Sequence, residues 1–348
     1  MSLTKHSRSL VAERKPAEAS ARLDVAYIPP AELPSHLALS GAYPMAIISF
    51  GHALPQPFSC PVIALDLPQI EGAPVVEVWT CDRPTQTQED SGCALVMNGE
   101  FLFGSISLVE PPVESLDVTT YAGYREMLHR LREVGYPYLW RAWNYFPGIN
   151  DNQRGLERYR RFCVGRHQAL IETLSDFPSS LPAATAVGTR SGPLQIVFLA
   201  GTQPATHLGN PRQFNAYEYP RQYGPRSPSF ARATCTRLKS QSLLCIAGTA
   251  SVVGHASRHV GLPYEQAKET MQNLRAVLTH TEQIAGVDLV EARHRAIYKV
   301  YVRNPHSLPE IRRGLEASPL AGHHVVFLQS ELCRKELLVE IEGLIISD

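Results

Sequence analysis

The chain has 348 residues, with 33 basic and 33 acidic side chains and 44% hydrophobic residues. This composition is typical of a globular protein and excludes a disordered or collagen-like chain. Because the formal net charge is zero, we expect no nucleic-acid partner, and any local cluster of cations suits a small anionic ligand.

The sequence lacks the usual signals for export and membrane insertion. No run reaches roughly 18 consecutive apolar residues, and residues 1–40 are polar or punctuated by Pro, without an apolar signal-peptide core. The seven Cys are scattered and show no C-x-x-C spacing, which favours reduced thiols over a disulfide framework or a zinc site. We therefore expect a cytoplasmic protein without metal or membrane contact, preceded by a partly ordered polar leader over 1–40.

Strands are expected from about residue 45, in MAIISF, PVIAL, PVVEVWTC and CALVMNGEFLFGSISL. The last of these runs contains Asn98–Gly99, which predicts a hairpin turn. An amphipathic helix is predicted over 117–135, because apolar residues recur at i, i+4 and i+7 from Tyr124. A strand in YPYLWRAWNYFPG, a helix over 152–174 and two strands in PAATAVGTRSGPLQIVFLAG complete this half.

The second half repeats this order. A strand in SLLCIAGTASVVG is followed by a helix in LPYEQAKETMQNLRAVLTHT, a strand in HRAIYKVYVRN and a short helix in SLPEIRRGLEA. Two strands in HHVVFLQSELCRKELLVEIEGLII end the chain. The repeated order predicts an internal duplication of an α+β unit of roughly 130 residues, with two helices backing a mixed sheet.

Four pieces of the second unit, AGTAS, QAKETMQNLRAVL, YKVYVRN and LLVEIEGL, resemble the Rid/YjgF-like fold. The resemblance implies a helix-backed sheet that forms trimers with ligand sites between subunits. Two tandem copies would build a chorismate-mutase-like barrel in one chain, as a monomer or a homotrimer. We predict an α+β protein with a degenerate N-terminal unit over 41–205 and a C-terminal unit over 206–348.

The final strand contains two carboxylates. Side chains alternate along a strand, so Glu340 and Glu342 share one face. A solvent-exposed face would explain both and is the more common arrangement in proteins. In the first unit, however, the residue that matches Glu340 is Gln195, so only the second unit has a carboxylate at this position. This is the pattern expected of a duplicated enzyme in which one of two active sites has degenerated.

Two segments concentrate cations beside apolar or aromatic residues. In RYRRFCVGRHQAL, residues 158–170, helical spacing places Arg166 on the face of Phe162 and Cys163, where a guanidinium needs an anionic partner. That partner is either a structural carboxylate or a ligand. Residues 215–233 interleave Tyr, Arg and Pro in a rigid loop, which suits either carboxylate binding or a subunit interface.

Together these stretches resemble the chorismatase family, which converts chorismate into dihydroxycyclohexadiene or hydroxybenzoate products. The resemblance extends from about Tyr138 to the end of the chain. It is carried by YLWRAWNYFPGIND, RYRRFCVGRHQAL, LPAATAVG, NPRQFNAYEYPRQYGPRSPSFARA, AGTASVVGH and CRKELLVEIEG. It implies an enzyme that needs no cofactor and releases pyruvate.

The resemblance also implies roles for residues. Glu340 becomes the proton donor to the enolpyruvyl group. The further residues expected at the substrate are Tyr145, Arg160, Arg166, Tyr217, Tyr223, Arg226, Ala247 and Gly248. We expect Arg160 and Arg166 at one of the two chorismate carboxylates, and Tyr217 and Arg226 at the other.

Cys333 is expected beside Glu340 as a second catalytic residue, and product choice is expected to depend on it and on the Ala247–Gly248 pair. Cys333 lies seven positions before Glu340, where the hydroxybenzoate-forming branch also has a Cys. This predicts 3-hydroxybenzoate, alone or mixed with 4-hydroxybenzoate, for a quinone, pigment or other secondary metabolite. The alternatives are hydrolysis to a dihydroxycyclohexadiene carboxylate, and a Rid-type imine-hydrolysing or binding protein. The Rid type would need an Arg in the strand HHVVFLQ, which has none.

Overall fold

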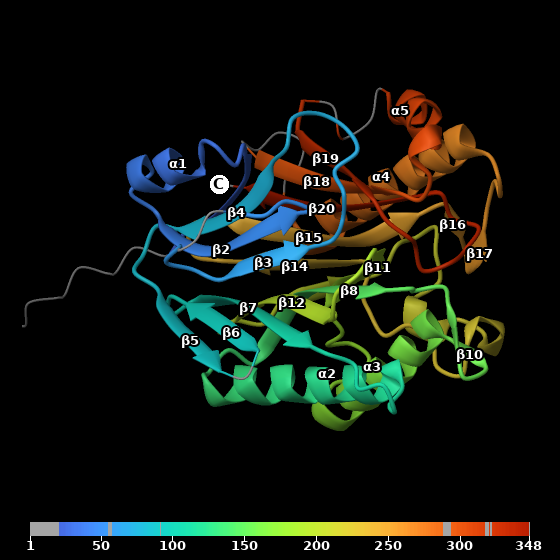
Figure 1. Ribbon diagram of the computed structural model, residues 1–348, viewed down its shortest axis with the longest axis horizontal. Coiled ribbons are helices and arrows are strands. Elements are labelled where there is room, and N and C mark those ends of the chain that lie inside the picture. Colours follow the sequence, from blue (N-terminus) through green and yellow to red (C-terminus); the bar gives the residue numbers. More distant parts are fainter. Residues whose placement is uncertain are drawn as a thin grey trace, which may run out of the picture.

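The computed structural model describes residues 21–54, 58–90, 92–287, 294–316, 320 and 322–347. Its main sheets are one of four strands and two of six strands. Helices α2 (Leu116–Glu133) and α3 (Arg158–Thr173) lie on one side of the sheets, and α4 (Pro263–Ala285) and α5 (Leu308–Leu315) lie on the opposite side (Figure 1). This arrangement confirms the predicted α+β class.

The first six-stranded sheet has the order β11-β8-β12-β7-β6-β5. Its strands are β5 (Gln86–Asp90), β6 (Cys93–Met97), β7 (Phe101–Leu108), β8 (Tyr138–Pro147), β11 (Ala183–Thr189) and β12 (Leu194–Gly201). Only the β11–β8 pair is parallel within this sheet. The predicted turn at Asn98–Gly99 joins β6 to β7, and Gly99 has a φ of 93°, which favours glycine.

The second six-stranded sheet has the order β13-β14-β15-β20-β18-β19. Its strands are β13 (Thr206–Leu208), β14 (Ala233–Arg237), β15 (Ser242–Ala250), β18 (His294–Val302), β19 (His324–Gln329) and β20 (Val339–Ser347). Starting from its β19 edge, this order matches the first sheet strand for strand, including the parallel edge pair and the positions of the two helices. The topology confirms the predicted duplication.

The N-terminal sheet is a reduced third copy of the same pattern. It contains β1 (Leu23–Ile28), β2 (Tyr43–Phe50), β3 (Val62–Leu65) and β4 (Val76–Cys81), with helix α1 (Leu33–Leu39) between β1 and β2. Its order β1-β4-β2-β3, with β2 and β3 parallel, corresponds to β15-β20-β18-β19. Among the described residues it has no counterpart of the first two strands of the repeat.

Two sequence-based boundaries need correction. The predicted first unit, 41–205, contains three strands of the N-terminal sheet besides the first six-stranded sheet, which begins at Gln86. The helix expected over 152–174 begins at Arg158, because the preceding residues form the hairpin β9 (Asn152–Gln153) and β10 (Leu156–Glu157). The assignment of the units to the Rid/YjgF-like fold stays a prediction.

The three sheets contact one another in a cyclic order. In each unit, the loop before the last strand makes a backbone contact with another unit. Gln69 of the N-terminal sheet contacts Leu328 of the second repeat, and Glu331 of the second repeat contacts Gly188 of the first. Arg190 of the first repeat contacts Asp66 of the N-terminal sheet, which closes the ring. A shared core fills the centre of this ring. There Trp79 lies 4.9 Å from Phe103 and 5.7 Å from Trp143 between ring centroids.

One position recurs in the last strands of the two six-stranded repeats. Gln195 of the first repeat lies opposite Tyr145, and Glu340 of the second lies opposite Tyr301. These two tyrosines pair in turn with the parallel edge strands, at Val187 and Leu328. This register supports the sequence-based match of Gln195 with Glu340. Gln195 is partly exposed and donates to the Ala64 carbonyl of the N-terminal sheet at 2.9 Å. Glu340 instead lines a cavity.

Candidate active site

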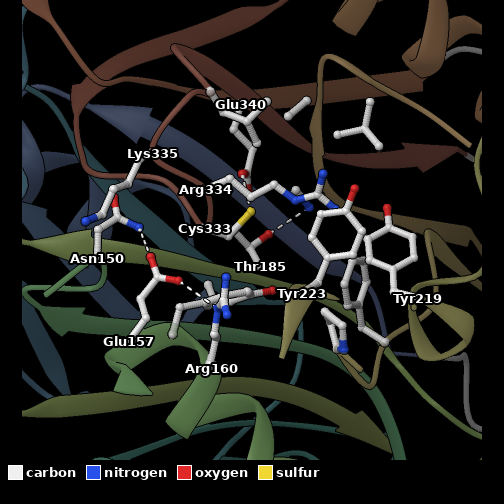
Figure 2. Close-up of a pocket in the computed structure, with 18 of the residues that line it drawn as sticks. Asn150, Glu157, Arg160, Thr185, Tyr219, Tyr223, Cys333, Arg334, Lys335 and Glu340 are labelled. Atoms are coloured by element: carbon white, nitrogen blue, oxygen red, sulfur yellow. Dashed lines mark hydrogen bonds and ion pairs between the residues drawn. The ribbon is translucent and has the colours of Figure 1, made fainter. Parts of the chain in front are cut away.

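The cavity lies where β11 of the first repeat meets β15 and β20 of the second, and its volume is about 690 Å³. Helix α3 and the two loops 209–230 and 330–338 complete its walls. Figure 2 shows Glu340, Cys333 and Thr185 in the middle, Arg334 and two tyrosines on one side, and Asn150 and Glu157 on the other. The charged residues that line it are Glu157, Arg160, Arg166, Arg232, Arg334, Lys335, Glu336 and Glu340.

Glu340 and Glu342 are both buried, at 4% and 3% exposure. The interpretation of this strand face as solvent-exposed is therefore wrong. β20 is a central strand of its sheet, and the face that carries both carboxyls looks into the core between the sheets, while Val339 and Ile341 face α4. The alternation of side chains along a strand predicts that Glu340 and Glu342 share a face, but it does not predict whether that face is buried by the rest of the protein.

The two carboxyls have opposite electrostatic environments. Burial, reinforced by the charge of Glu342, raises the pKa of Glu340 to about 8, so this carboxyl holds a proton at neutral pH. Burial also acts on Glu342, but Lys299 and Arg141 outweigh it and lower its pKa. Arg141 Nη2 lies 2.6 Å from Glu342 Oε2, and Lys299 Nζ lies 3.3 Å from Oε1. One buried glutamate is thus a neutral acid beside a fixed anion.

Gly248 leaves room for the carboxyl of Glu340. A Cβ atom at position 248 would lie 2.0 Å from Glu340 Oε1, so any larger residue would displace the acid. The Gly248 amide donates to Thr185 Oγ1 at 3.0 Å, and Arg141 donates to the same oxygen at 2.5 Å. Arg141 therefore links the anion Glu342 to the cavity wall beside Glu340.

Cys333 lies against the acid, with its Sγ 3.9 Å from Glu340 Oε2. Burial, with the neighbouring Glu340 carboxyl, raises the pKa of this thiol well above its ordinary value. The side chain is therefore a neutral thiol at physiological pH, and a thiolate nucleophile is not expected here.

Arg166 and Arg232 are buried cations, with exposed fractions of 3% and 6%. Arg166 donates to the Ser229 carbonyl at 2.6 Å, and Arg232 donates to the Tyr219 hydroxyl at 2.6 Å. Among the described residues, neither guanidinium has a carboxylate within ion-pair distance. Because a buried guanidinium with only neutral partners favours an incoming anion, both residues give the cavity an affinity for negative charge.

Arg334 forms part of the cavity wall with two tyrosines. Its guanidinium lies 4.0 Å from the ring centroid of Tyr223 and 5.2 Å from that of Tyr219. It also donates to the His255 carbonyl at 2.9 Å and to Ser257 Oγ at 3.0 Å. The position of this cation is thus fixed by stacking and by hydrogen bonds.

The structure brings six of the ten predicted site residues to this cavity, namely Glu340, Cys333, Arg160, Arg166, Tyr223 and Gly248. The other four do not line it. Tyr145 and Ala247 are fully buried in the core between the sheets. Tyr217 packs against the core beneath α2 and α3, and Arg226 is exposed on the loop. Tyr145 lies on β8 and Ala247 on β15, both facing the core, while the turns of the 215–233 loop direct Tyr217 and Arg226 away from the cavity.

Sequence reasoning missed several cavity residues. Arg232 and Tyr219 belong to the segment 215–233 that was singled out, but other members of that segment were chosen. Arg334 and Lys335 directly follow Cys333, and two adjacent cations beside a predicted catalytic Cys were a usable signal. Nothing in the sequence marked Glu157, because its proximity to the cavity depends on the start of α3.

Two further searches of the described residues are negative. No group of three or more His, Cys, Asp or Glu side chains is placed to hold a metal ion there. In that same part of the chain, every helix is too short or too polar to cross a membrane.

Comparison with known proteins points to one family. The family model described as chorismatase FkbO/Hyg5-like, N-terminal, matches residues 77–200. A 3-hydroxybenzoate synthase of Streptomyces hygroscopicus is 34% identical over 296 residues, which cover 82% of this chain and 85% of that protein. A chorismatase of the same organism is 38% identical over 277 residues, which cover 77% of this chain and 78% of that protein.

A crystal structure of a chorismatase is similar over the whole fold. Its TM-score is 0.83 at 32% identity, and the match covers 94% of this chain and 99% of that one. The fold and the cavity define an α+β enzyme of repeated units with a buried, protonated carboxyl in the cavity, and the identity to relatives over most of the chain is specific. The chain belongs to the chorismatase family, which confirms the resemblance found in its sequence.

Proposed function

We propose that this chorismatase converts chorismate into 3-hydroxybenzoate and pyruvate, with Glu340 as the proton donor. The observation that carries the proposal is a buried, protonated carboxyl in a cavity with two buried guanidiniums that lack carboxylate partners. The relative named 3-hydroxybenzoate synthase supports the product. A second hydroxybenzoate isomer, 4-hydroxybenzoate, has no separate support.

The charges of the cavity suit this substrate. Chorismate carries one carboxylate on its ring and one on its enolpyruvyl ether. Arg166, Arg232 and Arg334 are held in place by hydrogen bonds and offer N–H donors for carboxylate oxygens. Protonated Glu340 adds no negative charge, so a dianion enters without repulsion from the acid.

The reaction begins with proton transfer from Glu340 to the methylene carbon of the enolpyruvyl group. This protonation makes the ether carbon electron-deficient, so the bond between the ring carbon and the ether oxygen breaks more easily. The three-carbon group leaves as pyruvate. The neighbouring ring hydroxyl loses its proton, and its oxygen attacks the carbon that the ether oxygen leaves, which forms an epoxide across the two carbons. The bond from this oxygen to its original carbon then breaks, the other carbon loses its hydrogen as a proton, and the ring becomes the aromatic 3-hydroxybenzoate. One of the two released protons returns Glu340 to its acid form and the other goes to the phenol oxygen. The atoms of chorismate are thus all accounted for by hydroxybenzoate and pyruvate, and no water is consumed.

Product analysis tests the proposal and separates it from hydrolysis. Purified protein incubated with chorismate in ¹⁸O-labelled water should yield 3-hydroxybenzoate without label in its hydroxyl group. A non-aromatic dihydroxy acid as the product would instead assign the chain to the hydrolytic reaction, whichever carbon the water attacks. Absence of pyruvate would contradict both assignments.

The pH profile should show a single limb on the alkaline side. Because Glu340 must carry its proton and its raised pKa is about 8, kcat/KM should be level below that pH and fall about tenfold per unit above it. Steady-state rates between about pH 6 and 10 check this. A profile that rises through this range would require Glu340 to act as a base.

We propose that the protein is a monomer. The ring of three sheets closes within one chain, so the assembly that separate units would need is already complete. Light scattering after gel filtration should give 38.5 kDa. A mass three times larger would mean that the closed ring does not prevent trimerisation.

A further inference from the structure

Glu157 is a carboxylate in a cavity whose wall also carries four arginines, Arg160, Arg166, Arg232 and Arg334. It occupies the N-cap position of α3, but its side chain makes no hydrogen bond to the helix backbone. Instead, Oε1 accepts from Asn150 Nδ2 at 3.2 Å and Oε2 pairs with Arg160 Nε at 3.2 Å (Figure 2). The carboxylate is thus directed to the cavity rather than to the helix end, where a cap would stabilise α3.

The Asn150 side chain that donates to this carboxylate is itself held in place by the backbone. Asn150 is 6% exposed, and its Nδ2 also donates to the Leu332 carbonyl at 3.0 Å. This second bond ties the amide to the backbone residue that precedes Cys333. Each oxygen of Glu157 receives one donor from the protein and has a further lone pair to accept another hydrogen bond.

The substrate offers one group that this carboxylate can bind, an argument that rests on the proposed function. As a dianion, chorismate has two carboxylates, an ether oxygen and a single hydrogen-bond donor, the ring hydroxyl. A carboxylate beside any other part of the molecule would repel it or gain no hydrogen bond from it. A carboxylate at the hydroxyl gains a charge-assisted hydrogen bond.

The layout of the cavity agrees with this pairing. The hydroxyl of chorismate lies across the ring from the ring carboxylate and next to the carbon that carries the enolpyruvyl ether. In Figure 2, Arg334 with Tyr219 lies at one side, Glu157 lies at the other, and Glu340 lies between them. A ring carboxylate held on the Arg334 side therefore directs the hydroxyl towards Glu157 and the ether towards Glu340.

We propose that Glu157 accepts a hydrogen bond from the ring hydroxyl of chorismate and so selects substrates with a donor at that carbon. Asn150 holds the carboxylate at the distance that the ring requires. Ring dianions without this hydroxyl offer Glu157 no donor beyond those of Asn150 and Arg160, and they bind more weakly.

Two stable aromatic compounds isolate this contact from turnover. 3-(1-Carboxyvinyloxy)-4-hydroxybenzoate has the hydroxyl, and 3-(1-carboxyvinyloxy)benzoate lacks it, while both carry the same two carboxylates. Titration calorimetry should show that the wild-type protein binds the hydroxylated compound about tenfold to a hundredfold more tightly, as expected for a hydrogen bond to a charged group. Equal affinities would overturn the inference while leaving the proposed reaction intact.

Substitutions assign the preference to Glu157. Glu157→Ala should reduce the ratio of the two dissociation constants to about one, and Glu157→Gln, which keeps a weaker carbonyl acceptor, should give an intermediate ratio. Glu172→Gln, at the exposed far end of the same helix, should leave the ratio unchanged. A wild-type ratio in Glu157→Ala would refute the role of Glu157. Failure of both compounds to bind the wild type would contradict the proposed function as well.

Discussion

Replacing Glu340 with Gln should lower kcat by about a hundredfold or more, because general acid catalysis contributes roughly that factor. Gln has the size of Glu and fits the space beside Gly248, but its amide cannot deliver a proton to the enolpyruvyl methylene. KM should change little, since Glu340 is neutral at pH 7 and does not contribute charge to substrate binding. Release of pyruvate from chorismate measures both constants.

A control variant tests whether the loss of activity is specific to Glu340 or follows the removal of any nearby carboxylate. Glu331 is exposed on the same loop as Cys333 and does not line the cavity, so Glu331→Gln should keep wild-type kcat. Glu340→Asp shortens the side chain but retains an acid, and it should recover part of the rate. If Glu340→Gln turned over chorismate at the wild-type rate, another group would have to supply the proton.

Gly248→Ala should lower kcat by about tenfold to a hundredfold with little loss of stability. The added methyl group would lie 2.0 Å from Glu340 Oε1, so the carboxyl must move away from its position beside Cys333. A misplacement of about 1 Å is enough for a loss of this size when proton transfer requires exact alignment. Thermal unfolding and kcat, measured on the same preparation, distinguish displacement from unfolding.

A double variant shows whether Gly248→Ala acts through the acid. If the methyl group only displaces Glu340, adding Gly248→Ala to Glu340→Gln should cost far less than it does in the wild type, because the acid is already lost. Full additivity of the two effects would mean that the methyl group instead blocks the substrate.

Much of the fold follows from local patterns. The Asn98–Gly99 hairpin, the helix around Tyr124 and the duplicated order of elements each depend on short-range spacing, and all three are present. The four-stranded N-terminal sheet was not predicted as a unit. Its strands are short, and β1 lies within the segment 1–40, where polar residues dominated the pattern. Its relation to the other sheets depends on strand pairing over long separations, which a pattern of hydrophobicity does not contain.

The candidate site was predicted less completely than the fold. Glu340 and Arg166 stood out because a charged residue on an apolar strand or helix face needs an explanation. Glu157 and Arg334 did not, because each looks like an ordinary surface charge until α3 and the 330–338 loop meet around β11. Tyr217 and Arg226 were chosen from a suitable segment, but the direction of a loop side chain depends on turns that composition does not determine.

The cyclic arrangement of three units in one chain has an evolutionary consequence. In a symmetric trimer, a substitution changes all three equivalent clefts at once, so no cleft can specialise alone. Here Gln195 hydrogen-bonds to the neighbouring N-terminal sheet in one repeat, while Glu340 serves chemistry at the equivalent position of the other. Fusion of the units freed each cleft to accumulate its own mutations, so that structural reinforcement and catalysis no longer compete for the same residue.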